Sequence, residues 1–151
     1  MSKLHDAKFV QVIAPAAITD NASYTTAEVD TLGYNYATFI FNLGASDIAM
    51  TALKIQESDT SGSGMADIAG TVLGTATDID GSTTALPSAT DDNKFIVIQL
   101  DLRGRKRYLD MVATAGDGAT GTFAACSCVL TRADVAPESV SDAGCDTLIR
   151  A

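Results

Sequence analysis

One stretch of the chain, residues 94–115, constrains the fold more than any other. Residues 95–102 form a run of β-branched and aliphatic side chains, and residues 107–115 form a second run of strand-forming residues. Between the two runs lies Gly104, which can adopt the positive φ that a tight turn requires. The pattern predicts a β-hairpin at the core of a β-domain.

The turn of this predicted hairpin is basic. Four of the ten Lys and Arg residues fall within five positions here, although the formal net charge of the chain is -9. Arginine pairs bidentately with carboxylates, so the turn is a candidate site for docking on acidic groups of a partner or of a neighbouring copy. The alternative is a solvated tip that blunts an exposed sheet edge. The candidate partner-binding residues are Arg103, Arg105, Lys106 and Arg107.

The rest of the chain predicts further strands and almost no helix. Within residues 50–58, Leu53 and Ile55 are expected to point inward, because strand side chains alternate between faces. Residues 65–73 fit either a strand or one helical turn. The remaining candidate strands are residues 8–13, 24–29, 34–43 and 122–131. For residues 34–43, the expected core face carries Ala37, Phe39, Phe41 and Leu43.

We therefore expect an all-β fold, an antiparallel β-sandwich or a jelly-roll-like arrangement, with extended N- and C-terminal arms. At 151 residues the chain fits a single domain. Its core is expected over about residues 8–131. Residues 132–151 are expected to form the C-terminal arm, and a short helix from Pro137 is the alternative there.

The longest polar stretch is residues 74–93, which is rich in Thr, Ser, Asp and Gly. A loop of this length in a compact domain is usually functional or mobile. Residues 78–81 partly resemble a calcium-binding loop, but Ser and Thr follow Gly81 where an EF-hand needs further acidic ligands. The other interpretation is a solvated acidic loop, and we expect no metal site.

Charge and hydropathy exclude several classes of partner. A sequence pI near 4.3 argues against nucleic acid, because a phosphate backbone would be repelled. No apolar window approaches the length of a membrane helix, so we expect no membrane partner. The first residues lack the apolar core of a signal peptide, which predicts synthesis in a host cytoplasm without secretion. We interpret Cys126, Cys128 and Cys145 as free thiols, of the kind that are usually buried.

The sequence shows no recognisable set of catalytic residues. The single histidine, His5, lies in a predicted N-terminal arm, and without a second histidine no Ser-His-Asp or Cys-His pair can form away from that arm. The chain has no C-x-x-C pair for zinc, and its Gly-rich segments lack the strand-to-helix setting of a phosphate loop. We therefore expect no catalytic residues and no cofactor, and a protein that is not an enzyme.

Two short motifs resemble those of small structural proteins of tailed phages. Residues 54–59 (KIQESD) are similar to the end of a strand in that group, with Ile55 where the group has Leu. Residues 104–109 (GRKRYL) are similar to a segment that opens a later strand there. Residues 13–19 (IAPAAIT) also resemble the group, and the likeness spans most of residues 8–131.

This resemblance implies a virion protein, most similar to a capsid decoration, or cement, protein. Such a protein would bind the outer surface of the major capsid shell and stabilise it, and we expect a homotrimer located in the virion. The first alternative is a component of the phage tail or of the head–tail connector. The second alternative is a carbohydrate-binding β-sandwich for host attachment.

Overall fold

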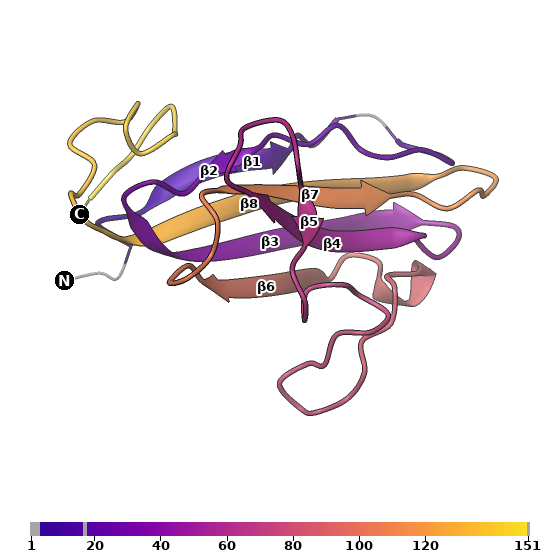
Figure 1. Cartoon of the computed structure of the whole chain (residues 1–151). Helices are drawn as coiled ribbons and strands as arrows, with labels where there is room; N and C mark the ends of the chain where they lie inside the picture. The colour runs from indigo at the N-terminus through magenta and orange to yellow at the C-terminus, as the bar shows by residue number, and fades with distance from the viewer. Residues whose placement is uncertain (1–3, 17, 151) are drawn as a thin grey trace.

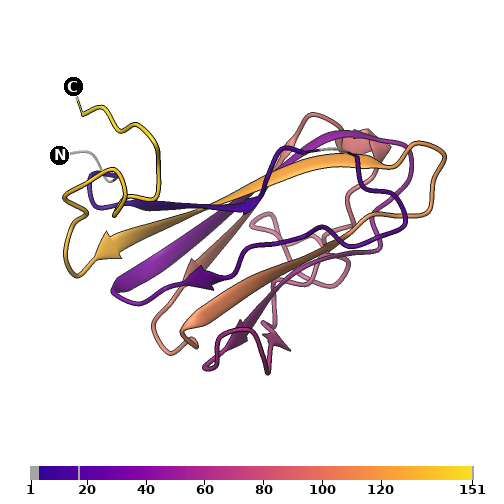
Figure 2. The ribbon, with the colours of Figure 1, turned by 90° about the horizontal axis from the view of Figure 1, so that it is seen from above.

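The computed structural model of the chain describes residues 4–16 and 18–150. Its strands form two antiparallel sheets of four strands each, and the sheets pack face to face as a β-sandwich (Figures 1 and 2). The first sheet has the order β1-β8-β3-β6, and the second has the order β2-β7-β4-β5. The strands are β1 (Lys8–Ile13), β2 (Val29–Asp30), β3 (Tyr34–Ser46), β4 (Ala52–Ser58), β5 (Ala66–Asp67), β6 (Phe95–Asp101), β7 (Tyr108–Thr114) and β8 (Thr122–Ala133).

The expected all-β sandwich and its core faces are confirmed. Leu53 and Ile55 of β4 are buried, as predicted, and they face the aromatic side chains of β3 across the core. Such alternation arises because successive side chains of a strand point to opposite faces. The predicted core set of β3, which is Ala37, Phe39, Phe41 and Leu43, is fully buried.

The predicted hairpin at residues 94–115 is wrong, although both of its strands exist. Strand β6 pairs with β3 in the first sheet, whereas β7 pairs with β2 and β4 in the second. The basic segment between them therefore crosses from one sheet to the other. Leu102, at the start of this crossing, is buried, and its amide donates to the carbonyl oxygen of Asn35. A buried apolar residue suits a crossing over the core better than an exposed hairpin tip.

The strand predicted at residues 24–29 is shorter than expected. Only Val29 and Asp30 form β2, because the preceding backbone divides its hydrogen bonds between the two sheets. The amide of Tyr24 donates to the carbonyl oxygen of Ala113 in β7, and the amide of Ala27 donates to that of Val12 in β1. Residues 65–73 likewise contain only the two-residue strand β5, followed by turns.

The two cysteines of β8 lie in the core. Cys126 and Cys128 are buried free thiols on the inner face of the first sheet, and Cys145 is a partly exposed free thiol. Burial raises the pKa of Cys126 to about 12, because desolvation disfavours the thiolate. The pKa of Cys128 is raised for the same reason. These two thiols act as small apolar side chains, as the sequence predicted.

The C-terminal segment folds back on the sandwich. The amide of Phe9 in β1 donates to the carbonyl oxygen of Ala143 at 2.7 Å, and Ala143 is fully buried. The first and last described segments of the chain therefore lie at the same end of the sandwich (Figures 1 and 2). Between residues 4 and 150, apart from residue 17, no helix is long and apolar enough to cross a membrane.

Gly144 permits this docking, and its replacement is the first test of the fold. A Cβ atom at Gly144 would overlap the carbonyl oxygen of Phe9, whereas a Cβ at Gly62 would meet nothing within 4 Å. Both residues have nearly the same φ, +71° and +72°. The positive φ alone costs an alanine roughly 1–2 kcal/mol.

We therefore expect Gly144→Ala to lower the free energy of unfolding by more than Gly62→Ala, which is its matched control. Hydrogen exchange should locate the difference, with faster exchange of the Phe9 amide only in Gly144→Ala. Equal losses of stability in the two variants, with Phe9 still protected, would contradict the docking of the C-terminal segment.

Candidate docking surface

The basic segment carries its charge largely in ion pairs with the chain itself. The guanidinium of Arg107 binds Asp30 in a bidentate manner, with Nε at 2.8 Å from Oδ1 and Nη2 at 2.7 Å from Oδ2. Arg103 binds Asp101, with its Nε at 2.9 and 3.0 Å from the two carboxylate oxygens. Both carboxyl pKa values are held below their usual range, chiefly by these hydrogen bonds.

The third arginine is also paired. Nη1 of Arg105 lies 3.4 Å from Oε1 of Glu57, and the other oxygen of this carboxylate accepts from the backbone amide of Lys106 at 3.1 Å. Among the described residues, the ammonium group of Lys106 forms no ion pair. The structure thus brings the four predicted residues together on one exposed loop, but it leaves only Lys106 without a carboxylate of its own.

The outer face of the second sheet is polar and internally bonded. Lys54 and Gln56 of β4 both donate to the carboxylate of Asp67 on β5, at 2.8 and 2.7 Å. On β7, Asp110 accepts from the hydroxyl of Thr26 at 2.8 Å. Charged side chains therefore cover this face and find partners within it, as expected of a surface that remains in water.

The outer face of the first sheet is different. Ile40 of β3 lies opposite Val97 of β6 and Ser127 of β8, so all three side chains share this outer face. Phe95 is 68% exposed and Val97 is 50% exposed. We call the central part of this surface the uncharged face, because the outward residues there carry no charge. It comprises Phe9, Gln11, Thr38, Ile40, Asn42, Phe95, Val97, Gln99, Ala125, Ser127 and Val129. Asp101 and Arg132 lie on the same side of the sheet but at one end of it, beside Tyr36.

Sequence reasoning did not identify the uncharged face, although one signal was present. Residues 95–98 of β6 read Phe-Ile-Val-Ile, without the polar alternation of a strand that has one face in water. Ile96 and Ile98 pack against the core, while Phe95 and Val97 point to the outside. An unbroken apolar run in an antiparallel edge strand indicates that something covers its second face.

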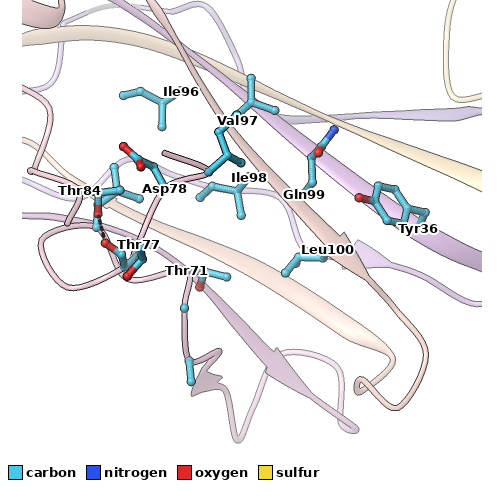
Figure 3. A pocket seen from close by; sticks show the side chains of 15 residues that line it. Tyr36, Thr71, Thr77, Asp78, Thr84, Ile96, Val97, Ile98, Gln99 and Leu100 are labelled. Carbon is cyan, nitrogen blue, oxygen red and sulfur yellow. Dashed lines mark hydrogen bonds between the residues drawn. The ribbon is translucent and has the colours of Figure 1, made fainter. Parts of the chain in front are cut away.

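An open groove lies beside β6, between the two sheets. It has a volume of about 690 Å³, and β6 forms one wall (Figure 3). Across from that wall lie Thr71 and the segment around Asp78 and Thr84 (Figure 3). The sandwich is open here because its second sheet ends in β5, which has only two residues.

The residues considered for metal binding and catalysis do not assemble into a site. Oδ1 of Asp78 accepts from the backbone amides of Asp80 and Ser82, so this carboxylate closes its own loop. His5 is exposed, and its carbonyl oxygen accepts from Arg150. Within the part of the chain that the structure describes, no group of three or more His, Cys, Asp or Glu residues is placed to hold a metal ion.

Comparisons with known proteins add no relative to this picture. No family model matches the chain, and neither a curated protein nor a solved structure was found to match it.

The Arg107–Asp30 pair gives a prediction about pH. The pKa of Asp30 in the folded chain is lower than its ordinary value of 3.8, first because Arg107 donates to its carboxylate. A depressed carboxyl pKa contributes stability that is present above the unfolded-state pKa and is lost as the pH falls through the folded-state pKa. The contribution is small, because both side chains are partly exposed.

We expect Arg107→Gln to raise the pKa of Asp30 toward 3.8 and to reduce the loss of stability below about pH 4. NMR titration of the Asp30 carboxyl carbon measures the shift. Lys106→Gln is the control, and it should leave this titration unchanged. A titration of Asp30 that is the same in Arg107→Gln and in the unmodified chain would show that the pair does not form in solution.

Proposed function

We propose that this chain is a structural protein of a phage virion that decorates the capsid and stabilises it by binding the outer surface of the major capsid shell. The observation that carries the proposal is the uncharged face. A monomeric protein that remained in water on both sides would gain nothing from exposing Phe95 and Val97 on an uncharged area of a sheet. A surface that docks on a larger protein explains the contrast between the two faces of the sandwich.

The size of the face suits a contact that is weak in one copy and strong in many. Four strands spaced about 4.8 Å apart, over five residues at about 3.4 Å each, give a plane on the order of 300 Å². A stable one-to-one interface buries about 800 Å² on each partner. Repetition over a symmetric shell, and joining of copies into the homotrimer that we also propose, would multiply such contacts into firm attachment.

The charge of the chain supports an outward position. With a net charge of -9, it would be repelled from packaged nucleic acid and is better suited to the exterior of a shell. The motifs at residues 54–59 and 104–109, which resemble those of phage structural proteins, favour a virion over other assemblies. Cryo-electron microscopy of the particle tests the location. Density for the chain on the tail axis alone would favour a tail or connector component instead.

A charge placed on the uncharged face should abolish docking without unfolding the protein. Ser127 is exposed at the centre of that face, so Ser127→Lys adds an ammonium group that docking would bury without a partner. We expect at least about tenfold weaker binding to capsid particles that lack the chain, measured by co-sedimentation. Ala52→Lys is the matched control, because it adds the same group to the outer face of the second sheet.

Both variants should unfold at similar temperatures. Binding that is weakened equally by both variants would point to overall charge, and binding that is weakened only by Ala52→Lys would assign docking to the second sheet. Either result would overturn the role of the uncharged face.

The basic loop makes a separate, smaller contribution in this proposal. Because Lys106 is the cation of the loop that has no partner among the described residues, it is the group available to a carboxylate of the shell. We expect Lys106→Ser to weaken particle binding a few-fold at low salt and to have little effect at high salt. Binding that does not change at low salt would leave the loop as a solvated crossing between sheets.

A further inference from the structure

Strand β6 is the open edge of the sandwich. At the other edge of the first sheet, β1 is bonded to the C-terminal segment through Phe9 and Ala143. The edge strands of the second sheet, β2 and β5, have only two residues each. Strand β6 has seven residues, pairs with β3 alone among the described strands and contains no proline. A long, apolar, unpaired edge is a template for one more strand.

The shape beside this edge selects a single extended segment. The groove runs along β6 and is lined by Ile96, Ile98 and Leu100, so the inward side chains of an added strand would enter it. The segment between β5 and β6 extends past β6 in Figure 1 and forms the far wall of the groove in Figure 3. An entire sheet edge from another molecule would meet this segment, whereas one isolated strand would lie between it and β6.

The residues that line the groove also indicate the charge that a bound segment should carry. Asp78 is the one charged residue among the described residues that line it. The other lining residues are apolar or are neutral Thr, Tyr, Gln and Gly. The complementary segment is therefore extended and apolar, with a cation.

The chain itself contains such a segment at residues 146–150, which read Asp-Thr-Leu-Ile-Arg. No backbone–backbone hydrogen bond joins this segment to another described residue, since the last bond of the C-terminal region is donated by the amide of Cys145. Ile149 is 81% exposed, and the guanidinium of Arg150 reaches the carbonyl oxygen of His5. The segment therefore has unpaired backbone groups, an exposed apolar side chain at Ile149, a half-buried one at Leu148, and a cation at its end.

A chain cannot place this segment on its own β6. Ala143 is bonded to β1, and β1 and β6 are the opposite edges of the first sheet. Crossing three strand spacings takes about 14 Å, which is most of the roughly 17 Å that five extended residues can span. Few residues would then remain to pair with β6, so the segment must come from a second copy.

We propose that residues 146–150 of one copy add as a strand along β6 of a neighbouring copy. Leu148 and Arg150 then lie on the side that enters the groove, with Arg150 beside Asp78, and Ile149 lies on the opposite side, next to the exposed Val97. The donated segment and the receiving edge are different surfaces, so the contact is heterologous and closes into a ring when the rotation between copies permits it. This inference rests on the self-association in the proposed function, and it names the surfaces that make the homotrimer.

Two measurements on the full chain test the exchange: sedimentation velocity over a range of concentrations, and hydrogen exchange of the β6 amides. We expect the unmodified chain to associate, with slower β6 exchange at high concentration. Ile149→Asp should weaken association at least about tenfold and remove the added protection of β6. Val140→Asp is the matched control, since Val140 is exposed on the same C-terminal region outside the donated segment.

A charge exchange separates the proposed contact from a purely structural role of Arg150. Arg150→Asp and Asp78→Lys should each weaken association, and the double variant should recover it in part, because the two charges again have opposite signs. A loss of the bond between Arg150 and the carbonyl oxygen of His5 would not be rescued by Asp78→Lys.

The outcomes distinguish this inference from the function on which it rests. Association that Ile149→Asp leaves intact would overturn the strand exchange while the homotrimer stands. A chain that remains monomeric at every concentration would overturn both the exchange and the homotrimer. Docking through the uncharged face would then still be decided by Ser127→Lys on the particle. Protection of β6 that appears only on capsid particles would assign the edge to a segment of the shell protein.

Discussion

The sandwich depends on one shared layer of apolar side chains between its two sheets. Phe39 and Phe41 of β3 enter this layer from one side, and Ile55 of β4 and Met111 of β7 enter it from the other. Neither sheet could bury its inner face alone, because a single sheet leaves both faces in water. The connections reflect this dependence. Except between β4 and β5, each strand is followed along the chain by a strand of the opposite sheet.

The sequence was sufficient to predict the long strands and the inner faces of β3 and β4, and insufficient to predict the partners of the strands. Alternation in β3 and β4 is a local property, so Phe39 and Ile55 could be assigned to the core from residue type and spacing. Pairing is not local. A short loop with a glycine, such as that around Gly104, joins strands of one sheet or of two, and the same residues suit both. In that loop, the burial of Leu102 is what distinguishes a crossing between sheets from a hairpin tip. Burial can be seen only in the folded structure.

The candidate site shows the same limit. Clustered cations stand out in an acidic sequence, so the basic segment was an obvious candidate for docking. Its carboxylate partners, Asp30 and Glu57, are distant along the chain, and only the fold reveals that they neutralise two of its arginines. The uncharged face could not be predicted in this way, because its neutral residues are spread over four strands and form no cluster in the sequence. Sequence reasoning finds concentrated charge more readily than a charge-free area spread over a sheet.

The pairing of β3 has a consequence for how the chain is made. Phe41 lies between Ile96 of β6 and Cys126 of β8, which follow it by more than fifty residues. During synthesis the longest strand of the molecule therefore leaves the ribosome well before either neighbour exists, and its aromatic side chains stay unpaired during that interval. Folds governed by such distant pairings close slowly, because a long loop must be ordered before its contacts stabilise it. Because of this strand order, the whole domain can fold only after the C-terminal third of the chain has been synthesised.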